Sequence, residues 1–402
     1  MSSSKRIVKN LQVYLENRVI PNGYVVMENG KITAAGDMDS LSPEWNSVEA
    51  ISFSGGKMKA VPGFIDLHIH GADGADAMDA TPEALTKIAK ALPAEGTTSF
   101  LPTTMTGSAA DIEQALENAA DFIESRYTDG AEALGVHLEG PFISPKRAGA
   151  QHPGNIVKPD KEQFKKWQEK ANGHIRLVTM APEEEGGLEL ASYLKETGVI
   201  ASIGHSDATY EQAVMGIKAG ISHATHLFNG MRGLHHREPG TAGTVLIHDE
   251  VKAEIIADGI HVRPEMVKLA YKNKTRDGLI IITDAMRAKC LGKGTYDLGG
   301  QEVTVDETQA TLTDGTLAGS ILKLKEAVTN VMSYTGCSLE DIVQMAAVNP
   351  ARQLGVFGRK GSIASGKDAD ITILDENHDV VMTFCRGRLV FEKQEGFGRE
   401  VD

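Results

Sequence analysis

Short apolar runs alternate with helical segments through the middle of the chain, while both ends show a different pattern. Each run is followed by a loop and then by a helical stretch, which is typical of parallel βα units. Several of the helical stretches begin with Ser, Thr or Pro and end at Gly, as helices prefer. The eight apolar runs cover residues 63–70, 97–104, 133–142, 175–183, 199–208, 222–230, 251–262 and 278–286.

Eight parallel strands with intervening helices close naturally into a barrel, so we expect a (β/α)8 TIM barrel over residues 62–360. Two further helical segments, residues 320–336 and 339–355, close this region. In such barrels the active site lies at the carboxyl ends of the strands. The polar residues of the eight runs fall at those ends, so candidate chemistry is sought there.

The two ends of the chain have the pattern of short strands and turns. Residues 7–61 contain apolar runs around Asn29-Gly30, a dipeptide typical of a β-hairpin. The same pattern returns from Gly361 onward. We therefore expect residues 1–61 and 361–402 to pair into one small, discontinuous β-sandwich domain beside the barrel, in an α/β fold.

The composition narrows the class of protein. The chain has 402 residues, with 41 Lys and Arg against 55 Asp and Glu, and its net charge of −14 argues against nucleic-acid binding. No stretch approaches the roughly 18 to 20 apolar residues of a membrane helix, and the first twenty residues are too polar for a signal-peptide core. We expect no membrane association and a cytoplasmic location. Cys290, Cys337 and Cys385 lack CxxC spacing, which argues against a disulfide framework or a thiolate zinc site.

Two histidines, His68 and His70, end the first apolar run in the sequence DLHIH. Because side chains alternate along a strand, both imidazoles and the Asp66 carboxylate project to one side. Two neutral imidazoles at the mouth of a barrel suit a cation such as zinc or iron(II). The HxH pattern alone is a weak signal, since histidines also form hydrogen bonds in polar loops.

Four other runs also end in His, Glu or Asp: Glu139 in the third, His205 in the fifth, His226 in the sixth and Asp284 in the eighth. Taken singly, Glu139 could be a surface carboxylate, and His205 and His226 could be packed or capping histidines. Asp284 could be the N-cap of the following loop. Thirteen histidines distributed by chance would seldom place such side chains at five of eight strand ends. The set therefore predicts a divalent metal site.

Asp284 follows a buried apolar strand directly and should emerge at the same mouth. A carboxylate close to a metal-bound water can take the proton of that water and return it to a leaving group. His137 and His223 lie two and three residues before Glu139 and His226. We expect these two histidines to support the metal ligands and not to bind the metal themselves.

Motifs along nearly the whole chain resemble those of the N-acetylglucosamine-6-phosphate deacetylases, a family within the amidohydrolase superfamily. The matching segments are PGFIDLHIHG, HLEGPF, GHSDA, HLFNGM, REPG, DGIHV, TDAM, NPAR and GKDADI. Other amidohydrolases share HxH, but few share HLEGPF together with HLFNGM and REPG. The resemblance implies metal-dependent hydrolysis of the acetamide of N-acetyl-D-glucosamine 6-phosphate to D-glucosamine 6-phosphate and acetate, a step of amino-sugar catabolism.

The resemblance also implies how the metal is held. Glu139, His205 and His226 match the ligands of the principal divalent cation, and Asp284 matches the catalytic acid/base. One branch of the family lacks the HxH histidines and works with a single cation. This chain keeps them, which implies a second cation bridged through Glu139. Zinc or iron is the expected metal, with manganese as a further candidate.

For the substrate, the family places a phosphosugar across the barrel mouth. His152 matches a histidine near the acyl carbonyl, and Arg237 matches a phosphate-contacting arginine that reaches the neighbouring subunit's site, which implies a homodimer. Gly230 stands where alanine is common in the family, and this exchange is expected to matter little if the backbone contacts the substrate. The remaining positions that match substrate contacts or the pocket wall are Gln151, Asn229, Gly230, Asp258, His261, Leu317, Ala318 and Gly319.

Two other functions stay open at this point. A different amidohydrolase, such as a cyclic-amide hydrolase or a deaminase, would commonly use a carboxylated lysine at the barrel mouth, where this chain has Glu139. A metal-independent phosphosugar-binding barrel, either an isomerase or a sensor, would leave the histidines without a role. Metal analysis with and without a chelator separates the second alternative from a metal-dependent hydrolase.

Overall fold

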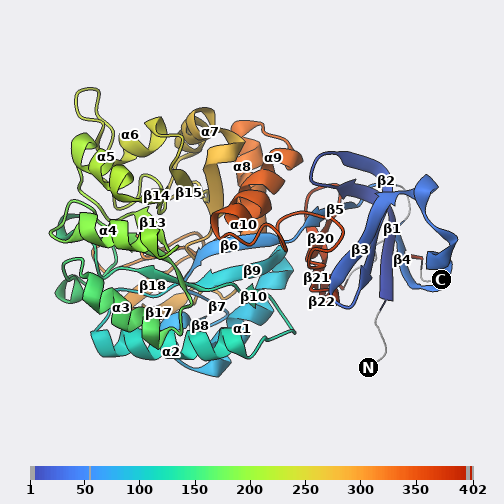
Figure 1. Cartoon of the computed structure of the whole chain (residues 1–402), viewed down its shortest axis with the longest axis horizontal. Coiled ribbons are helices and arrows are strands. Elements are labelled where there is room, and N and C mark those ends of the chain that lie inside the picture. Colours follow the sequence, from blue (N-terminus) through green and yellow to red (C-terminus); the bar gives the residue numbers. More distant parts are fainter. Residues whose placement is uncertain (1–4, 54–55, 395–398, 401–402) are drawn as a thin grey trace.

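The structure is a computed structural model that describes residues 5–53, 56–394 and 399–400. Its larger part is a ring of parallel strands surrounded by helices (Figure 1). The eight strands are β6 (Phe64–Ile69), β9 (Thr97–Pro102), β11 (Val136–Glu139), β12 (Ile175–Met180), β13 (Ile200–Ile203), β14 (Ile221–Ala224), β15 (Lys252–Ile256) and β16 (Leu279–Ile282). Each contains one or more of the apolar residues that the sequence places in the corresponding run.

Hydrogen bonding closes these strands into a barrel. Strands β11 to β16 form one parallel sheet, and β6 pairs with β9 in parallel. Parallel bridges from Thr103 to His137 and from Ile69 to Ala285 join the two sheets at their carboxyl ends. The closed ring confirms the predicted (β/α)8 barrel, and it brings all eight strand ends to one mouth.

Helices cover the outside of the barrel, and several begin at the predicted caps. The side chains of Thr81, Ser108 and Thr209 accept hydrogen bonds from backbone N–H groups of the first turns. The helices are α1 (Pro82–Ala91), α2 (Ala109–Glu124), α3 (Lys161–Lys170), α4 (Gly187–Glu196), α5 (Tyr210–Ala219), α6 (Gly240–Ile247), α7 (Pro264–Gly278), α8 (Leu324–Thr335), α9 (Leu339–Val343) and α10 (Asn349–Gln353). A π-helical turn over residues 344–348 joins the last two, so the second closing segment is helical as predicted. Among the described residues, no helix is long and apolar enough to cross a membrane.

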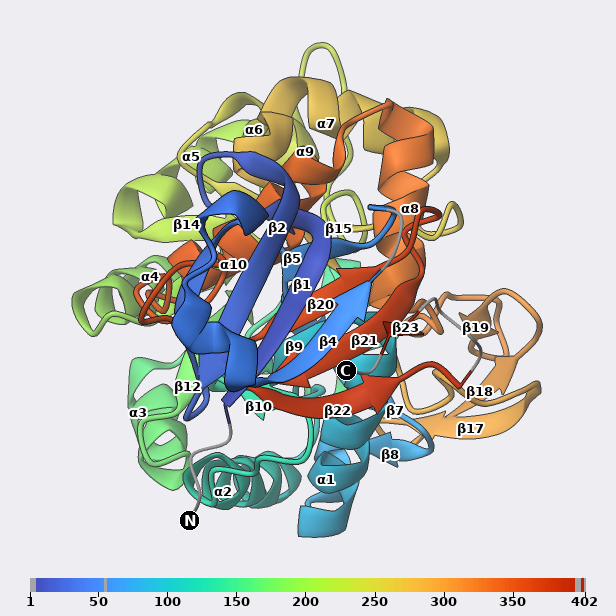
Figure 2. The same ribbon diagram turned by 90° about the vertical axis from the view of Figure 1, so that its right-hand side faces the viewer.

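The two ends of the chain come together in one branched sheet beside the barrel (Figures 1 and 2). Its strands are β1 (Lys5–Tyr14), β2 (Val19–Glu28), β3 (Lys31–Asp37), β4 (Glu49–Phe53), β5 (Lys59–Pro62), β20 (Ile371–Leu374), β21 (Val380–Cys385), β22 (Arg388–Glu392) and β23 (Arg399–Glu400). Strand β1 pairs with β4 over one stretch and with β5 over the next, so the sheet folds around a core that includes Leu11, Val25 and Phe384. Asn29 and Gly30 have φ of 51° and 80° in the β2–β3 turn, which confirms the predicted hairpin. The fold class of a barrel with a small β-sandwich is confirmed.

A small antiparallel sheet after β16 is a feature that the sequence analysis did not predict. It consists of β17 (Gly294–Leu298), β18 (Gln301–Val305) and β19 (Ala310–Thr311), and Figure 2 shows it projecting to one side. Its apolar side chains pack on Met105 and Met286 near the barrel mouth. Shorter strand pieces are β7 (Gly71–Ala72), β8 (Ala75–Asp76) and β10 (Glu132–Ala133).

Candidate active site

Six side chains from five strand ends converge at the barrel mouth. They form two groups whose possible ligand atoms lie within 4.8 Å of one another, one of His68, His70 and Asp284 and one of Glu139, His205 and His226. All six residues are buried. A cavity of about 220 Å³ opens above them, and five of the six line its wall. The structure thus brings together all the residues that the sequence places at the metal site.

Glu139 is the centre of one group. Its Oε1 lies 3.2 Å from Nε2 of His205 and 3.0 Å from Nε2 of His226, and the two Nε2 atoms are 3.2 Å apart. Nδ1 of His205 donates to the carbonyl oxygen of Arg147 at 2.8 Å. That bond leaves Nε2 of His205 to face Glu139, where the neutral ring offers a lone pair to a cation and the cationic ring donates to the carboxylate.

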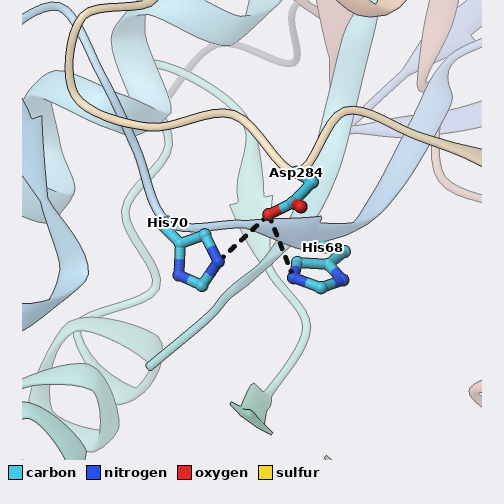
Figure 3. A group of neighbouring side chains, drawn as sticks. All are labelled: His68, His70 and Asp284. Atoms are coloured by element: carbon cyan, nitrogen blue, oxygen red, sulfur yellow. Dashed lines mark ion pairs between the residues drawn. The ribbon is translucent and has the colours of Figure 1, made fainter. Parts of the chain in front are cut away.

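Asp284 joins the other group. Its Oδ1 lies 3.3 Å from Nε2 of His68 and 3.1 Å from Nε2 of His70, as Figure 3 shows. In Figure 3 both dashed lines end on this one oxygen, and the second carboxylate oxygen of Asp284 carries none. Nδ1 of His70 lies 3.2 Å from the carbonyl oxygen of Thr103, so the protein fixes this ring from behind as well.

The Glu139 carboxylate connects the two groups. While Oε1 faces His205 and His226, Oε2 lies 3.3 Å from Nε2 of His70 and accepts a hydrogen bond from Nε2 of Gln151 at 2.8 Å. This is the arrangement expected of a carboxylate that bridges two cations.

The spacing of the donor atoms fits metal coordination. A bond of about 2.0–2.1 Å from zinc to nitrogen places the ligand atoms of one ion about 3.0–3.4 Å apart, which matches the distances in both groups. Nε2 of His68 is buried and has no hydrogen-bond partner among the described residues, although two carboxylates surround it. Imidazole and carboxylate donors of this kind suit divalent cations of the zinc and iron type, so the residues present fit such a group.

The electrostatics of the site also favour cations. Burial would raise the pKa of Glu139, but the charge of His68 and hydrogen bonds from His205 and His226 lower it well below its usual range. Burial likewise opposes ionisation of Asp284, whereas His68 and His70 lower its pKa below the ordinary value. Both carboxylates are therefore negative at neutral pH. Among the described residues, their ion-pair partners are histidines alone.

A second row of side chains lies behind the ligands. Nε2 of His137 bonds to Oγ1 of Thr179 at 2.7 Å, and Nε2 of His223 bonds to Oε1 of Glu254 at 3.0 Å. Neither histidine lines the cavity, although His137 forms a third group of possible ligand atoms with His68 and Glu254. Glu254 is a member of this row that the sequence analysis missed, although an acidic residue between Ala253 and Ile255 in an apolar run is itself a signal.

The predicted substrate residues fall into three sets. Those that line the cavity are Gln151, Asn229, Gly230, His261, Leu317 and Gly319. Asp258 lies behind His261, because its Oδ2 accepts a hydrogen bond from Nδ1 of His261 at 2.7 Å. Ala318 is completely buried in the apolar cluster below the wall and does not line the cavity.

His152 and Arg237 form the third set, since neither lines the cavity of this chain. His152 is exposed, and its Nδ1 accepts a hydrogen bond from the backbone N–H of Gly154. Arg237 lies on an exposed loop, where its Nη1 is 2.7 Å from Nε2 of His236. The structure therefore leaves both side chains outside the site formed by one chain.

Gly230 is more constrained than its sequence position suggests. Its φ is 59°, and a Cβ added there would lie 3.0 Å from Nδ1 of His205. An alanine at this position would require the backbone or the His205 ring to shift.

Comparisons with known proteins agree with this geometry. Residues 60–390 match the model of the amidohydrolase family. N-acetylglucosamine-6-phosphate deacetylase of Bacillus subtilis (strain 168) is 48% identical over 97% of this chain and 98% of its own. N-acetylgalactosamine-6-phosphate deacetylase of Escherichia coli O157:H7 is 38% identical over 82% of this chain and 86% of its own. A solved structure of mutant N-acetyl-D-glucosamine-6-phosphate deacetylase from Mycobacterium smegmatis, in complex with N-acetyl-D-glucosamine-6-phosphate, superposes with a TM-score of 0.89 at 29% identity, covering 97% of this chain and 100% of that one.

Proposed function

The chain belongs to the amidohydrolase family, and from that premise we propose that it hydrolyses the acetamide of N-acetyl-D-glucosamine 6-phosphate to D-glucosamine 6-phosphate and acetate. The observation that carries the proposal is the pair of ligand groups joined by Glu139 at the floor of the cavity. The relatives named above are deacetylases of hexosamine phosphates. A linear amide is therefore the bond that these groups are arranged to cut.

The proposed cofactor is a divalent metal, zinc or iron(II) in the first place and manganese as a further candidate. Glu139, His205 and His226 would hold the first ion, and His68, His70 and Asp284 the second. Such an ion lowers the pKa of a bound water from about 15.7 to about 7 and polarises a carbonyl oxygen.

Asp284 carries the proton transfers in this proposal. Its carboxylate is ionised at neutral pH, and the oxygen to which no dashed contact runs in Figure 3 would accept a proton from the attacking water. The same group then donates that proton to the departing nitrogen, which would otherwise leave as an unstable anion. The backbone N–H of Asp284 donates to the carbonyl oxygen of His68 at 2.9 Å, so the position of the carboxylate is fixed.

The acyl end of the substrate lies near Gln151 and His152 in this proposal. Gln151 already donates to Glu139 and lines the cavity, so it holds the bridging carboxylate in place. His152 would rotate from Gly154 toward the cavity to donate to the carbonyl oxygen. A well-placed donor of that kind stabilises the transition state by roughly 3 to 4 kcal/mol.

The phosphate end is assigned to His261 and Arg237. Burial lowers the pKa of His261, but its hydrogen bond with Asp258 raises the pKa above the ordinary value overall, which favours the cationic ring. Arg237 would come from a second copy of the chain, because its loop is exposed and its side chain lies outside the cavity of its own chain. We therefore propose a cytoplasmic homodimer with Arg237 reaching the neighbouring site. Asn229, Gly230, Leu317 and Gly319 would form the wall around the sugar, with Ala318 supporting it.

The test is acetate release from a panel of N-acetylated hexosamine 6-phosphates and their phosphate-free sugars, with and without a chelator. We expect turnover of the glucosamine derivative, loss of turnover on chelation and poor turnover of phosphate-free sugars. Equal rates with phosphate-free sugars would remove the role given to His261 and Arg237. Activity that survives complete metal removal would refute the proposal.

A further inference from the structure

Glu254 is a completely buried carboxylate on β15 whose partners are histidines. Its Oε2 accepts hydrogen bonds from Nδ1 of His68 at 3.0 Å and from the backbone N–H of His226 at 3.1 Å. Its Oε1 accepts one from Nε2 of His223 at 3.0 Å. Across the described ranges, no Lys or Arg forms an ion pair with it. The groups that offset its charge are thus the rings of His68 and His223 and the backbone N–H of His226.

The bond to His68 fixes which ring nitrogen carries the proton. An ionised carboxylate can only accept, so Nδ1 of His68 donates to it, and the neutral ring that would bind a cation then presents the lone pair of Nε2. In Figure 3 one ring nitrogen of His68 faces Asp284 and the other lies on the opposite side of the ring. Nε2 is 3.3 Å from Oδ1 of Asp284 and 3.5 Å from Oε1 of Glu139. When the ring is neutral, these three electron-rich atoms repel one another unless a cation lies between them.

We propose that Glu254 is a positioning residue that enables the chain to hold a second divalent cation at His68, His70 and Asp284. It touches neither the cation nor the substrate. It acts through His68, because the hydrogen bond orients the ring and makes Nε2 a more basic ligand. This inference rests on the proposed two-cation site and does not depend on the identity of the sugar.

The first cation should depend on Glu254 much less. His205 is oriented by the carbonyl oxygen of Arg147, and Glu254 meets His226 at its backbone N–H and not at its ring. The carbonyl oxygen of a glutamine at position 254 can accept both bonds that Oε2 now accepts. Replacing the carboxylate by the amide therefore removes the charge behind His68 while the backbone of His226 keeps its partner.

The test measures metal binding in Glu254→Gln by stepwise titration of Zn²⁺ against a chromophoric chelator, together with the metal content per chain. We expect the first ion to bind as in the unmodified chain and the second to bind about 10 to 100 times more weakly. The matched control is Glu183→Gln. Glu183 accepts hydrogen bonds from Oγ of Ser206 at 2.7 Å and from the N–H of Asp207 at 2.6 Å but from no histidine side chain, so its variant should bind both ions normally.

Two results of the Glu254→Gln titration would overturn the inference: unchanged affinity for both ions, or an equal loss of both, which would indicate a merely structural role. If Glu254→Gln does not fold, Glu254→Asp keeps the charge on a shorter side chain, and the same selective loss of the second ion is expected. An unmodified chain that binds a single ion also overturns the inference. An unmodified chain that binds two ions yet releases no acetate from the hexosamine phosphates would refute the proposed substrate and leave the role of Glu254 intact.

Discussion

Replacing Asp284 by asparagine should abolish most turnover while leaving the fold and the first metal ion in place. The two side chains have the same shape, so the carbonyl oxygen of asparagine can occupy the position of Oδ1, 3.1 Å from Nε2 of His70 and 3.3 Å from Nε2 of His68. The amide nitrogen then takes the place of the second oxygen. It has no lone pair with which to accept the proton of water.

The size of the effect follows from the two proton transfers assigned to this one group. A positioned general acid or base contributes about 10²- to 10⁴-fold. Because Asp284 both accepts and returns the proton, we expect kcat to fall by about 10³- to 10⁴-fold, which corresponds to roughly 4 to 5.5 kcal/mol in the activation barrier. Stability should change little, since the substitution also removes the repulsion between Asp284 and the neighbouring Glu139 carboxylate.

The assay is acetate release under saturating substrate, combined with metal analysis of the same preparation. Asp277→Asn is the matched control, because Asp277 is an exposed carboxylate just before the opposite end of the same strand, β16. It should keep full activity. An Asp284→Asn variant that holds its first metal ion and retains more than a tenth of the activity would refute the assignment of the proton transfers to Asp284.

Three further predictions concern the metal, a partly buried charge cluster around Glu132 and a buried ion pair. Chelation should abolish acetate release and lower Tm, and added Zn²⁺ should restore both; an unchanged Tm would argue against ions in the buried site. Burial raises the pKa of Glu132, but Arg359 and Lys360 lower it to about 2, so its stabilisation is present above pH 4.5 and lost as the pH falls toward 2. Glu132→Gln should therefore cost about 3 kcal/mol in denaturant unfolding at pH 7 and progressively less in acid, whereas a cost independent of pH would contradict this. Lys289→Met should lower the free energy of unfolding by about 3 to 5 kcal/mol, because it leaves the Glu95 carboxylate, 2.9 Å away, buried and unpaired. Replacing Glu95 by glutamine in that background should recover most of the loss. No recovery would mean that packing and not charge is responsible.

The barrel could be predicted from the sequence because its signal is local. Each strand is an apolar run long enough to cross a buried sheet, and several helices carry their own caps, as Thr81 and Ser108 illustrate. The sheet of β17–β19 was missed even though Gly299-Gly300 stands between two of its strands. That pair is a hairpin signal, but apart from Leu298, Val303 and Val305 the residues of the flanking strands are exposed or partly buried, and they form no apolar run.

The meeting of the candidate ligands could be predicted from the sequence for a geometric reason, and the residues that support them could not. Strand ends of one barrel must meet, so polar residues such as His205 and Asp284 could be placed together without knowing any contact. Glu254 lies within its strand, and only the structure shows that its partners come from other strands. The directions of His152 and Arg237 depend on loop conformation, which the sequence pattern does not specify.

Three of the site residues adopt the left-handed backbone region, which shows how the site is held before any ion binds. His205, His226 and Asp284 have φ of 45°, 31° and 50°. For residues other than glycine this conformation costs about 1 to 3 kcal/mol and persists only where the surroundings enforce it. Here backbone hydrogen bonds do so: Ser144 donates to the carbonyl oxygen of His205 at 2.9 Å, and Ser320 donates to that of Asp284 at 2.7 Å.

The consequence is a rigid arrangement of donors at the mouth of the barrel. The sharp turn after each strand directs the side chain inward, where a regular continuation of the strand would direct it elsewhere. Since the strain is already borne by the folded barrel, an arriving ion does not have to reorganise the backbone to obtain its ligands. The strained turns at the ends of β13, β14 and β16 therefore have the same effect as the bond from Glu254 to His68. Both hold candidate ligands in position before an ion binds.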